Sequence, residues 1–502
     1  MSDYDYNIVG SGPASFFLCL SILNRNPNAK IRIFEAGNKR NLVKSQNFSY
    51  EEGEQKFNLD PTTFIGFGGT SNLWHNVVAP LDEEDFQERE WINNSGWPIK
   101  KEELNFYYQE VANFLNFDFN LFNASSHDKF LKEETRKIVI DEDVFENKFF
   151  LQLKKPFRAV DEFIALKKKY SIDILLDHQV LKLKFNENLS EVKRIEAGVL
   201  GQKKEFEVKN LIICCGAIET TRLLLNSNIE TISNDVLGHN FMDHPMGNAF
   251  QMKYQEKKLT KMYSDLNFSK QLKIKSAIKL HQKTQMKLRL PNHCFYLRPA
   301  FAEGIDNSTE KMKLKLLAIR EKILKYKLPI AEGFELMTNI NLARQILLYK
   351  TGLSAGHLLA DYMFVTEQTP TRESNISLSE EKDIYGMPKA KINWEISESD
   401  LRSLDKYYDL CKNFLTKDNN ANFTINKEDI AWKKRLASAA HHLGTARMGA
   451  NQKNSVVDKN LRVHGSKNLY ISDGSVFPTS GNANSTYTIM ALSMRLGSYL
   501  EN

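Results

Sequence analysis

Groups able to move a proton and hold an oxygen stand near the C-terminal end of the chain. His441 and His442 are adjacent imidazoles, and a neutral imidazole can accept a proton near neutral pH. Asn484 carries an amide that can donate a hydrogen bond, and it directly precedes residues 485–499, which predict a helix. A short apolar strand is predicted to end before Asp473. The tail therefore offers a base, a turn-ended strand and an amide that opens a helix.

A glycine-rich turn at the other end of the chain predicts a nucleotide site. Residues 5–10, 13–24 and 30–34 predict the strand, helix and second strand of a βαβ unit. Gly10 allows the tight turn, and Gly12 lets the backbone approach a pyrophosphate at the N-terminus of the helix. A glycine turn in a nucleotide-free α/β fold is the alternative, but an exposed helix N-terminus has no packing purpose there.

The second strand is followed by an acid, as a dinucleotide fold requires. Glu35 is expected to accept hydrogen bonds from ribose hydroxyls, and its charge argues against a 2′-phosphate. Ser15 replaces the third glycine of the fingerprint and is small enough for close helix–strand packing. The turn alone does not separate FAD from NAD. Together with the base and amide of the tail, it indicates a redox enzyme.

Length and composition predict a globular protein of two or more joined domains. The chain has 502 residues, of which 42% are apolar and 26% are charged. Its 68 basic and 62 acidic side chains give a net charge of +6, which is too mild a bias for a nucleic-acid-binding protein.

Cysteine spacing and the N-terminal sequence favour a cytoplasmic protein. The number of cysteines is odd and no C-x-x-C pair is present, so neither a metal site nor a disulfide framework is predicted. No leader segment and no apolar run of roughly 20 residues is found. The five cysteines are Cys19, Cys214, Cys215, Cys294 and Cys411.

Residues 311–327 predict a basic amphipathic helix. Met312, Leu316, Ile319 and Ile323 fall on one helical face, and lysines and an arginine occupy much of the remainder. Such a helix can make weak contact with an anionic membrane surface, here the inner face of the membrane. The alternative is a surface helix that packs on its own domain.

The rest of the chain gives a coarse map of elements and no internal repeat. The stretch 250–430 has little recognisable signature. Elsewhere the sequence predicts a glycine-rich turn at 64–72, an amphipathic helix at 98–115, short strands between 171 and 215 that end where a helix begins at Gly216, and a half-exposed strand at 390–394.

Several blocks resemble the glucose–methanol–choline (GMC) family of FAD-dependent oxidoreductases. The C-terminal block, His441 to Met490, is the most specific, and in the block at 216–227 Thr221 stands where proline is usual. With an asparagine at position 484, the C-terminal block resembles the pyranose and sterol oxidase branches of the family more than it resembles glucose oxidase. The other blocks are Gly10-Ser11-Gly12-Pro13-Ala14, Phe34-Glu35-Ala36-Gly37, Gly68-Gly69-Thr70-Ser71-Asn72-Leu73-Trp74 and Asn240-Phe241-Met242-Asp243-His244-Pro245.

The resemblance implies an α/β (α+β) fold with two interleaved domains. A Rossmann-like FAD-binding domain is expected from residues 1–80, 155–248 and 432–502. A substrate-binding or cap domain, with a mostly antiparallel sheet and covering helices, is expected from residues 81–154 and 249–431.

The resemblance also assigns roles to individual residues. The His-x-x-Gly-Thr spacing selects His441 over His442 as catalytic base, and Asn484 is the second catalytic residue. Leu73 stands where some pyranose oxidases carry a flavin-linked histidine, which excludes that linkage and leaves His75 to be checked. The implied cofactor contacts are Gly10, Gly12, Pro13, Ala14, Glu35, Gly68, Gly69, Thr70, Asn72, Gly216, Asp473, Gly474, Asn484, Ser485 and Thr486.

Some roles stay open at this level. Asn484 could be only a helix N-cap. Asp243 and His244 could line the cofactor site or stabilise a turn, and Trp74 could cover the flavin or belong to the core. The implied activity is FAD-dependent oxidation of a CH–OH group of a sugar-like, polyol or other small alcohol, with oxygen, a quinone or another carrier as acceptor. A non-redox flavoprotein lyase or isomerase and a flavin-binding subunit without turnover are the alternatives.

Overall fold

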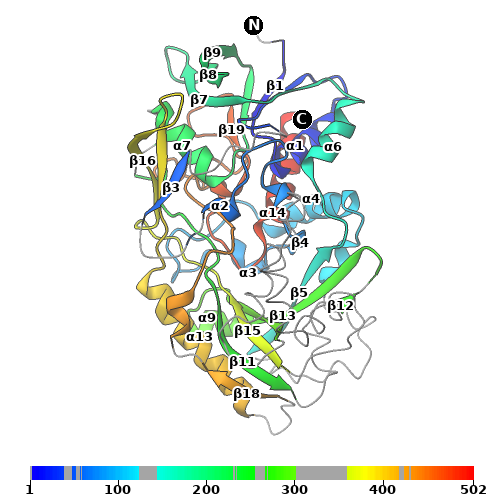
Figure 1. The fold of residues 1–502 in the computed structure, drawn as a ribbon, viewed down its shortest axis with the longest axis vertical. Helices are drawn as coiled ribbons and strands as arrows, with labels where there is room; N and C mark the ends of the chain where they lie inside the picture. The colour runs from blue at the N-terminus through cyan, green and yellow to red at the C-terminus, as the bar shows by residue number, and fades with distance from the viewer. Residues whose placement is uncertain are drawn as a thin grey trace, which may run out of the picture.

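A five-stranded parallel sheet forms one end of the molecule (Figure 1). The computed structural model describes residues 3–38, 48–52, 57, 59–123, 144–229, 232, 235–254, 266–267, 269–300, 359–417, 423–428 and 431–502. The sheet has the order β19-β10-β1-β2-β6, and every neighbouring pair is parallel. Its strands are β1 (Tyr6–Val9), β2 (Ile31–Phe34), β6 (Ile172–Leu175), β10 (Asn210–Ile213) and β19 (Leu469–Ile471).

Helices α1 (Pro13–Arg25) and α14 (Ser485–Leu500) pack against each other beside this sheet, joining the two ends of the chain (Figure 1). Their backbones approach closely at Gly497, where a Cβ atom would lie 2.6 Å from the side chain of Ser21. The Ser21 hydroxyl also donates to the carbonyl of Met494 at 2.6 Å. Helix α4 (Lys101–Phe114) covers another side of α14.

An eight-stranded, largely antiparallel sheet occupies the other end of the molecule (Figure 1). Alternation of polar and apolar residues builds it, as in Leu272-Lys273-Ile274-Lys275. Its order is β18-β11-β15-β14-β13-β5-β4, with β12 paired to β13. The strands are β4 (Val77–Val78), β5 (Phe145–Leu153), β11 (Met246–Tyr254), β12 (Leu266–Asn267), β13 (Leu272–Leu280), β14 (Cys294–Ala300), β15 (Leu359–Val365) and β18 (Phe423–Glu428).

Two three-stranded sheets and several helices complete the described fold. The sheets are β16-β17-β3 and β7-β8-β9, and α7 packs against strands of both. Their strands are β3 (Ser49–Glu52), β7 (His178–Phe185), β8 (Val192–Val199), β9 (Gln202–Glu207), β16 (Asn375–Lys382) and β17 (Pro388–Asn393). The remaining helices are α2 (Leu59–Thr62), α3 (Glu83–Phe86), α6 (Ala159–Lys167), α7 (Ala217–Ser227), α9 (Gln282–Leu288) and α13 (Glu398–Lys417).

The predicted α/β fold class and most predicted elements are confirmed. The structure contains the strand–helix–strand unit at the N-terminus, α4 within 98–115, β17 overlapping the strand expected at 390–394, and α14 from 485. Residues 311–327 lie outside the described residues. The five parallel strands fall inside the segments expected for the nucleotide domain, whereas β3 pairs with β17 across an expected boundary. The domain boundaries therefore stay a prediction.

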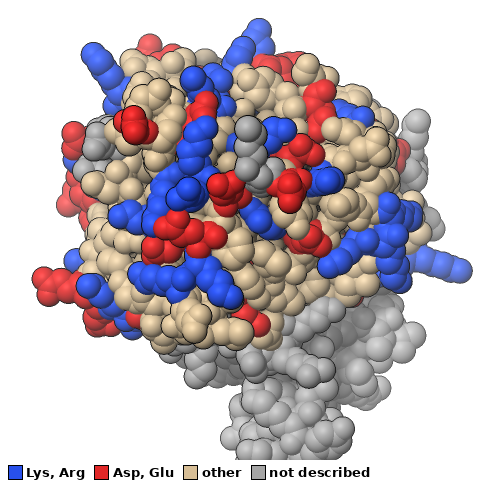
Figure 2. Space-filling view, turned by 90° about the horizontal axis from the view of Figure 1, so that it is seen from above, with Lys and Arg blue, Asp and Glu red and all other residues tan. Residues whose placement is uncertain are grey.

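The face at the parallel-sheet end carries charges of both signs (Figure 2). Ion pairs such as Lys203–Glu196 at 3.1 Å and Lys209–Asp5 at 3.1 Å join exposed charges of opposite sign in the described chain. This mixing agrees with the mild net charge and gives no single-sign surface on that face. Among the helices that the structure describes, none is long and apolar enough to cross a membrane.

Candidate active site

A cavity of about 840 Å³ extends from the N-terminal glycine turn to the antiparallel sheet. Its walls come from segments far apart in the chain, including the turn after β1, the loop at 69–75, the start of α7, the histidines at 441 and 442 and the start of α14. All of the expected cofactor contacts except Gly68 and Asn72 line this cavity. Both expected catalytic residues line it as well.

The glycine turn is shaped by close backbone contacts on one side and open space on the other. Gly10 has a φ of +97°, and a Cβ atom on it would lie 2.5 Å from the carbonyl oxygen of Cys214. Gly12 is the N-cap of α1, and a Cβ atom there would meet nothing within 4 Å. The open space above Gly12 and the first-turn N–H groups of α1 form a cradle suited to an anion.

Glu35 closes the turn from the end of β2. One of its oxygens accepts from the backbone N–H of Ser11 at 3.2 Å and from the Ser11 hydroxyl at 2.6 Å, and the other accepts from the N–H of Gly37 at 3.0 Å. Burial raises the pKa of Glu35 to about 7 against these hydrogen bonds. The expected contact of Glu35 with a ribose stays a prediction.

Asp473 ties the end of β19 to the start of α7. Its carboxylate accepts from the N–H of Gly216 at 3.0 Å and the hydroxyl of Thr220 at 2.6 Å, and from the N–H and hydroxyl of Ser475 at 2.9 Å and 2.6 Å. Asp473 therefore holds two cavity-lining segments together. Its expected cofactor contact, through the neighbouring backbone, stays a prediction.

In the loop around η2 (Gly69–Asn72), some side chains line the cavity and others hold the loop together. The amide of Asn72 donates to the carbonyls of Phe67 and Gly69, at 3.0 Å and 2.9 Å, so this side chain shapes the loop itself. Leu73, Trp74 and His75 line the cavity. Trp74 also packs edge-on against Phe157, with ring centroids 6.3 Å apart.

The two expected catalytic side chains meet directly. Asn484 Nδ2 lies 3.0 Å from His441 Nε2. Asn484 is the N-cap of α14, yet its side chain makes no capping hydrogen bond to the helix. The side chain of Asn484 therefore does not cap α14, and its amide is directed at the imidazole of His441.

A second imidazole lies behind His441. His441 Nδ1 is 3.0 Å from His244 Nδ1, and His244 Nε2 is 3.2 Å from the carbonyl oxygen of Ser480. Burial, with the charges of His244 and other histidines, holds the pKa of His441 well below its usual range. Burial also lowers the pKa of His244 to about 4. Both rings are therefore neutral at neutral pH.

His442, the neighbouring imidazole, packs against aromatic side chains. Its ring lies 4.9 Å from the ring of Phe57 and 6.1 Å from that of Phe241, both of which are core residues. His442 also borders the cavity. His441, by contrast, contacts Asn484 and His244 through its two ring nitrogens, and its role as base stays a prediction.

Sequence reasoning missed the far wall of the cavity, which the antiparallel sheet supplies. Lys275 Nζ lies 4.2 Å from the centre of the Tyr296 ring, and Arg298 Nη2 lies 3.8 Å from Asp361 Oδ2. The family resemblance implied a mostly antiparallel sheet but gave no signal that it faces the histidines. The polar residues of this wall are Gln152, Lys273, Lys275, Tyr296 and Arg298.

Metal binding finds no support in the described part of the chain. No cluster of three or more histidine, cysteine, aspartate or glutamate side chains there is arranged to hold a metal ion. All five cysteines are free thiols, and only Cys215 is partly exposed.

Two curated proteins are similar to parts of this chain. A protein described as 2-methyl-1,2-propanediol dehydrogenase, from Mycolicibacterium austroafricanum, is 31% identical over 150 residues, which are 29% of this chain and 25% of that protein. The fructose dehydrogenase large subunit of Gluconobacter japonicus is 24% identical over 60% of this chain and 48% of its own length. The chain thus spans about a quarter to a half of these curated relatives.

Solved structures match over the whole chain and establish the fold. Pyridoxine 4-oxidase, from the organism given as Mesorbium loti, superposes with a TM-score of 0.62 over 99% of both chains at 14% identity. A fungal aryl-alcohol oxidase superposes with a TM-score of 0.59 over 100% of this chain and 99% of that one, at 13% identity.

Family profiles match both halves of the site. Two profiles described as GMC oxidoreductase match residues 160–246, which include Gly216 and His244, and residues 370–493, which include His441 and Asn484. These matches and the relatives agree with the motifs, and both segments of the chain are similar to the GMC oxidoreductase family.

Proposed function

We propose that this protein is an FAD-dependent oxidoreductase that oxidises a CH–OH group of a sugar-like, polyol or other small alcohol. The observation that carries the proposal is the 3.0 Å contact between His441 and Asn484 at the wall of a cavity that also contains the glycine turn. A bound flavin supplies the hydride acceptor for such chemistry. The protein must supply the base and hold the alcohol.

His441 is suited to the role of base because it is neutral and its Nε2 atom lies beside Asn484 in the cavity wall. A neutral imidazole can take the hydroxyl proton as the C–H bond breaks. The amide of Asn484 can donate to the same oxygen and hold it without competing for the proton.

The cradle around Gly12 fits the pyrophosphate of FAD, and Glu35 at the end of β2 fits the ribose. The N-terminus of α14, at Ser485 and Thr486, lines the cavity, and the positive end of the helix dipole favours negative charge there. Leu73 cannot form a covalent flavin link, so binding through that position is non-covalent.

Polar side chains at the far wall support a substrate that carries several hydrogen-bonding groups. Gln152, Lys275 and Tyr296 border the cavity from β5, β13 and β14. The names of the relatives point the same way, because one acts on a diol and another on fructose. The acceptor that reoxidises the flavin is oxygen, a quinone or another carrier.

An absorbance spectrum followed by anaerobic titration tests the proposal. The purified protein should be yellow, and one member of a panel of alcohols and sugars should bleach it. The His441→Ala variant should keep its flavin and be reduced roughly 10²–10⁴-fold more slowly, which is the usual contribution of a general base. A colourless protein that does not take up FAD, or an equal rate in the variant, would contradict the proposal. Turnover without bleaching would indicate a lyase or isomerase.

A further inference from the structure

The contact between His441 and His244 follows from the pairing of two segments. Met242 and Leu443 form an antiparallel bridge, and in this register residue 244 stands opposite residue 441. Two backbone hydrogen bonds of 2.9 Å join Met242 and Leu443. The two imidazoles are therefore cross-strand neighbours, and their rings stand at 74° to each other with centroids 4.8 Å apart.

Asp243 fixes the backbone of both histidines. Its Oδ1 atom accepts from the N–H groups of His244 at 2.6 Å and His441 at 3.1 Å. The same carboxylate accepts from the N–H of Ala439 at 3.1 Å and the hydroxyl of Ser438 at 2.6 Å. One fully buried carboxylate thus sets the separation of the two rings.

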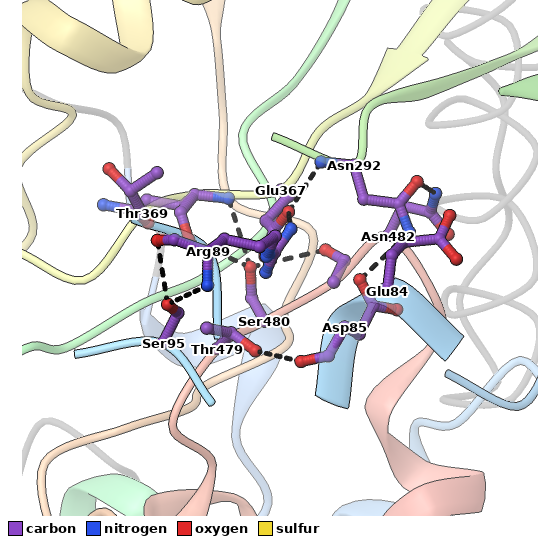
Figure 3. A network of polar contacts seen from close by, with 12 residues as sticks. Glu84, Asp85, Arg89, Ser95, Asn292, Glu367, Thr369, Thr479, Ser480 and Asn482 are labelled. Carbon is purple, nitrogen blue, oxygen red and sulfur yellow. Dashed lines mark hydrogen bonds and ion pairs between the residues drawn. The ribbon is translucent and has the colours of Figure 1, made fainter. Parts of the chain in front are cut away.

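The Ser480 carbonyl beyond His244 is held by a buried polar network (Figure 3). The Ser480 hydroxyl donates to the carbonyl of Gln368 at 3.1 Å and accepts from its N–H at 3.1 Å. Thr479 donates to the carbonyl of Asp85 at 3.1 Å, and the Asn482 amide donates to Asn292 at 2.9 Å. The carbonyl therefore has a fixed position.

Donors and acceptors along this line permit one arrangement of protons. A carbonyl oxygen only accepts, so His244 Nε2 must carry a hydrogen that it donates to Ser480. In a neutral ring, His244 Nδ1 is then a bare acceptor. The facing atom, His441 Nδ1, must carry the hydrogen of the 3.0 Å contact. His441 Nε2 is consequently bare and accepts from Asn484.

We propose that His244 is a positioning residue that orders the tautomer of His441, so that the Nε2 lone pair faces Asn484 and the cavity. His244 is fully buried and does not line the cavity, so it acts only through His441. The inference rests on the proposed role of His441 as base. Without the acceptor at His244 Nδ1, His441 can place its hydrogen on Nε2, where it can no longer take a proton.

Nitrogen NMR of protein labelled at its eleven histidines tests the tautomers without any turnover. His441 should show a protonated Nδ1 and a bare Nε2, and His244 the reverse. Spectra of His441→Gln and His244→Asn assign the two rings. A protonated Nε2 in the parent His441 would overturn the proposal. In His244→Ala, the His441 signals should move toward a mixture of both tautomers.

The rate of flavin reduction provides a second test of the role of His244. His244→Ala should slow reduction roughly 10–100-fold with little change in KM, the range typical for losing the hydrogen-bond partner behind a metal-bound histidine. His244→Asn, whose amide oxygen can stand in for Nδ1, should recover much of this loss. An equal rate in His244→Ala at equal flavin content would also overturn the proposal.

His293 offers a matched control for the loss of a buried imidazole. It is as buried as His244, burial lowers its pKa to about 4, and it contacts Ser403 at 3.0 Å away from the cavity wall. His293→Ala should lower the melting temperature and leave the reduction rate per flavin unchanged. An equal rate loss in both variants would assign His244 to stability and overturn the proposal. If no alcohol reduces the parent, the proposed function fails and the NMR arm alone decides this inference.

Discussion

The amide nitrogen of Asn484 lies 3.0 Å from Nε2 of His441, although 43 residues separate them in the chain. One residue begins helix α14 and the other lies in a loop bridged to the strand-like segment at 242–246. The contact places a donor and a lone pair where one hydroxyl oxygen can interact with both. It is the geometric basis of the activity proposed for this protein.

Removing the donor should affect chemistry more than stability. Asn484→Ala should slow flavin reduction about 10–100-fold, which corresponds to the ~1.5–3 kcal/mol typical of a hydrogen bond to a group that becomes charged. Its melting temperature should stay close to the parent value because Asn484 makes no side-chain cap to α14. Stopped-flow reduction and thermal unfolding measure the two effects. Asn484→Asp, which keeps the size but loses the donor, should also be slow. A large loss of stability at an unchanged rate would instead assign Asn484 to capping.

The two glycines of the N-terminal turn should respond differently to the same added methyl group. Gly12→Ala should fold, because its Cβ meets nothing within 4 Å, yet it should bind FAD at least about tenfold more weakly because the methyl group enters the cradle. Gly10→Ala should be destabilised by about 1–3 kcal/mol, since its φ is +97° and its Cβ would clash with the carbonyl of Cys214.

Thermal unfolding and the flavin content of the purified variants separate these effects. Normal flavin content in Gly12→Ala would contradict the assignment of this cradle to the pyrophosphate. A parental melting temperature in Gly10→Ala would contradict the argument from strain.

Local pattern was enough to predict the nucleotide half of the site. Apolar strands, a proline-started helix and Glu35 follow one another within a short stretch, and β1, α1 and β2 form where they were expected. These elements are set by residues close together in the sequence. Strands of a parallel sheet are buried on both faces, so they appear in the sequence as continuous apolar runs. The full set of fifteen cofactor contacts came from the family resemblance and not from local pattern; thirteen of them line the cavity, and Gly68 and Asn72 do not.

The catalytic surroundings could not be predicted in the same way, because they depend on contacts between distant segments. His244 and His441 are 197 residues apart, and only the bridge between Met242 and Leu443 sets them opposite each other. Likewise, nothing in the sequence around β13 indicates that Lys273 and Lys275 border the cavity. Family spacing selected His441 without giving the partner that lies behind it.

A buried ion pair next to the Ser480 segment should be costly to break. Arg89 and Glu367 form a two-fold contact at 2.7 Å and 2.6 Å, with side chains 4% and 0% exposed (Figure 3). Glu367→Gln leaves the arginine charge buried without its counter-ion, and should lower the free energy of unfolding by about 3–5 kcal/mol. The double variant Arg89→Met/Glu367→Leu should lose less free energy of unfolding, because neither charge of this pair remains buried. Urea unfolding of both variants measures the difference, and an effect of the single change below about 1 kcal/mol would contradict it.

The pH dependence of flavin reduction should report the environment of His441. The base is active when neutral, so the rate is full at high pH and is lost as pH falls through the pKa of His441. Burial, followed by the charges of His244, His442 and His75, holds that pKa well below its usual range. An ordinary histidine would be half protonated near pH ~6.5, so a rate that is still on its plateau at that pH distinguishes the two cases.

Anaerobic stopped-flow reduction with a substrate that does not ionise, followed from neutral pH downward at constant ionic strength, provides the measurement. Loss of half the rate at or above pH ~6.5 would show that His441 is not held neutral by burial, and would remove it as the base poised for this reaction.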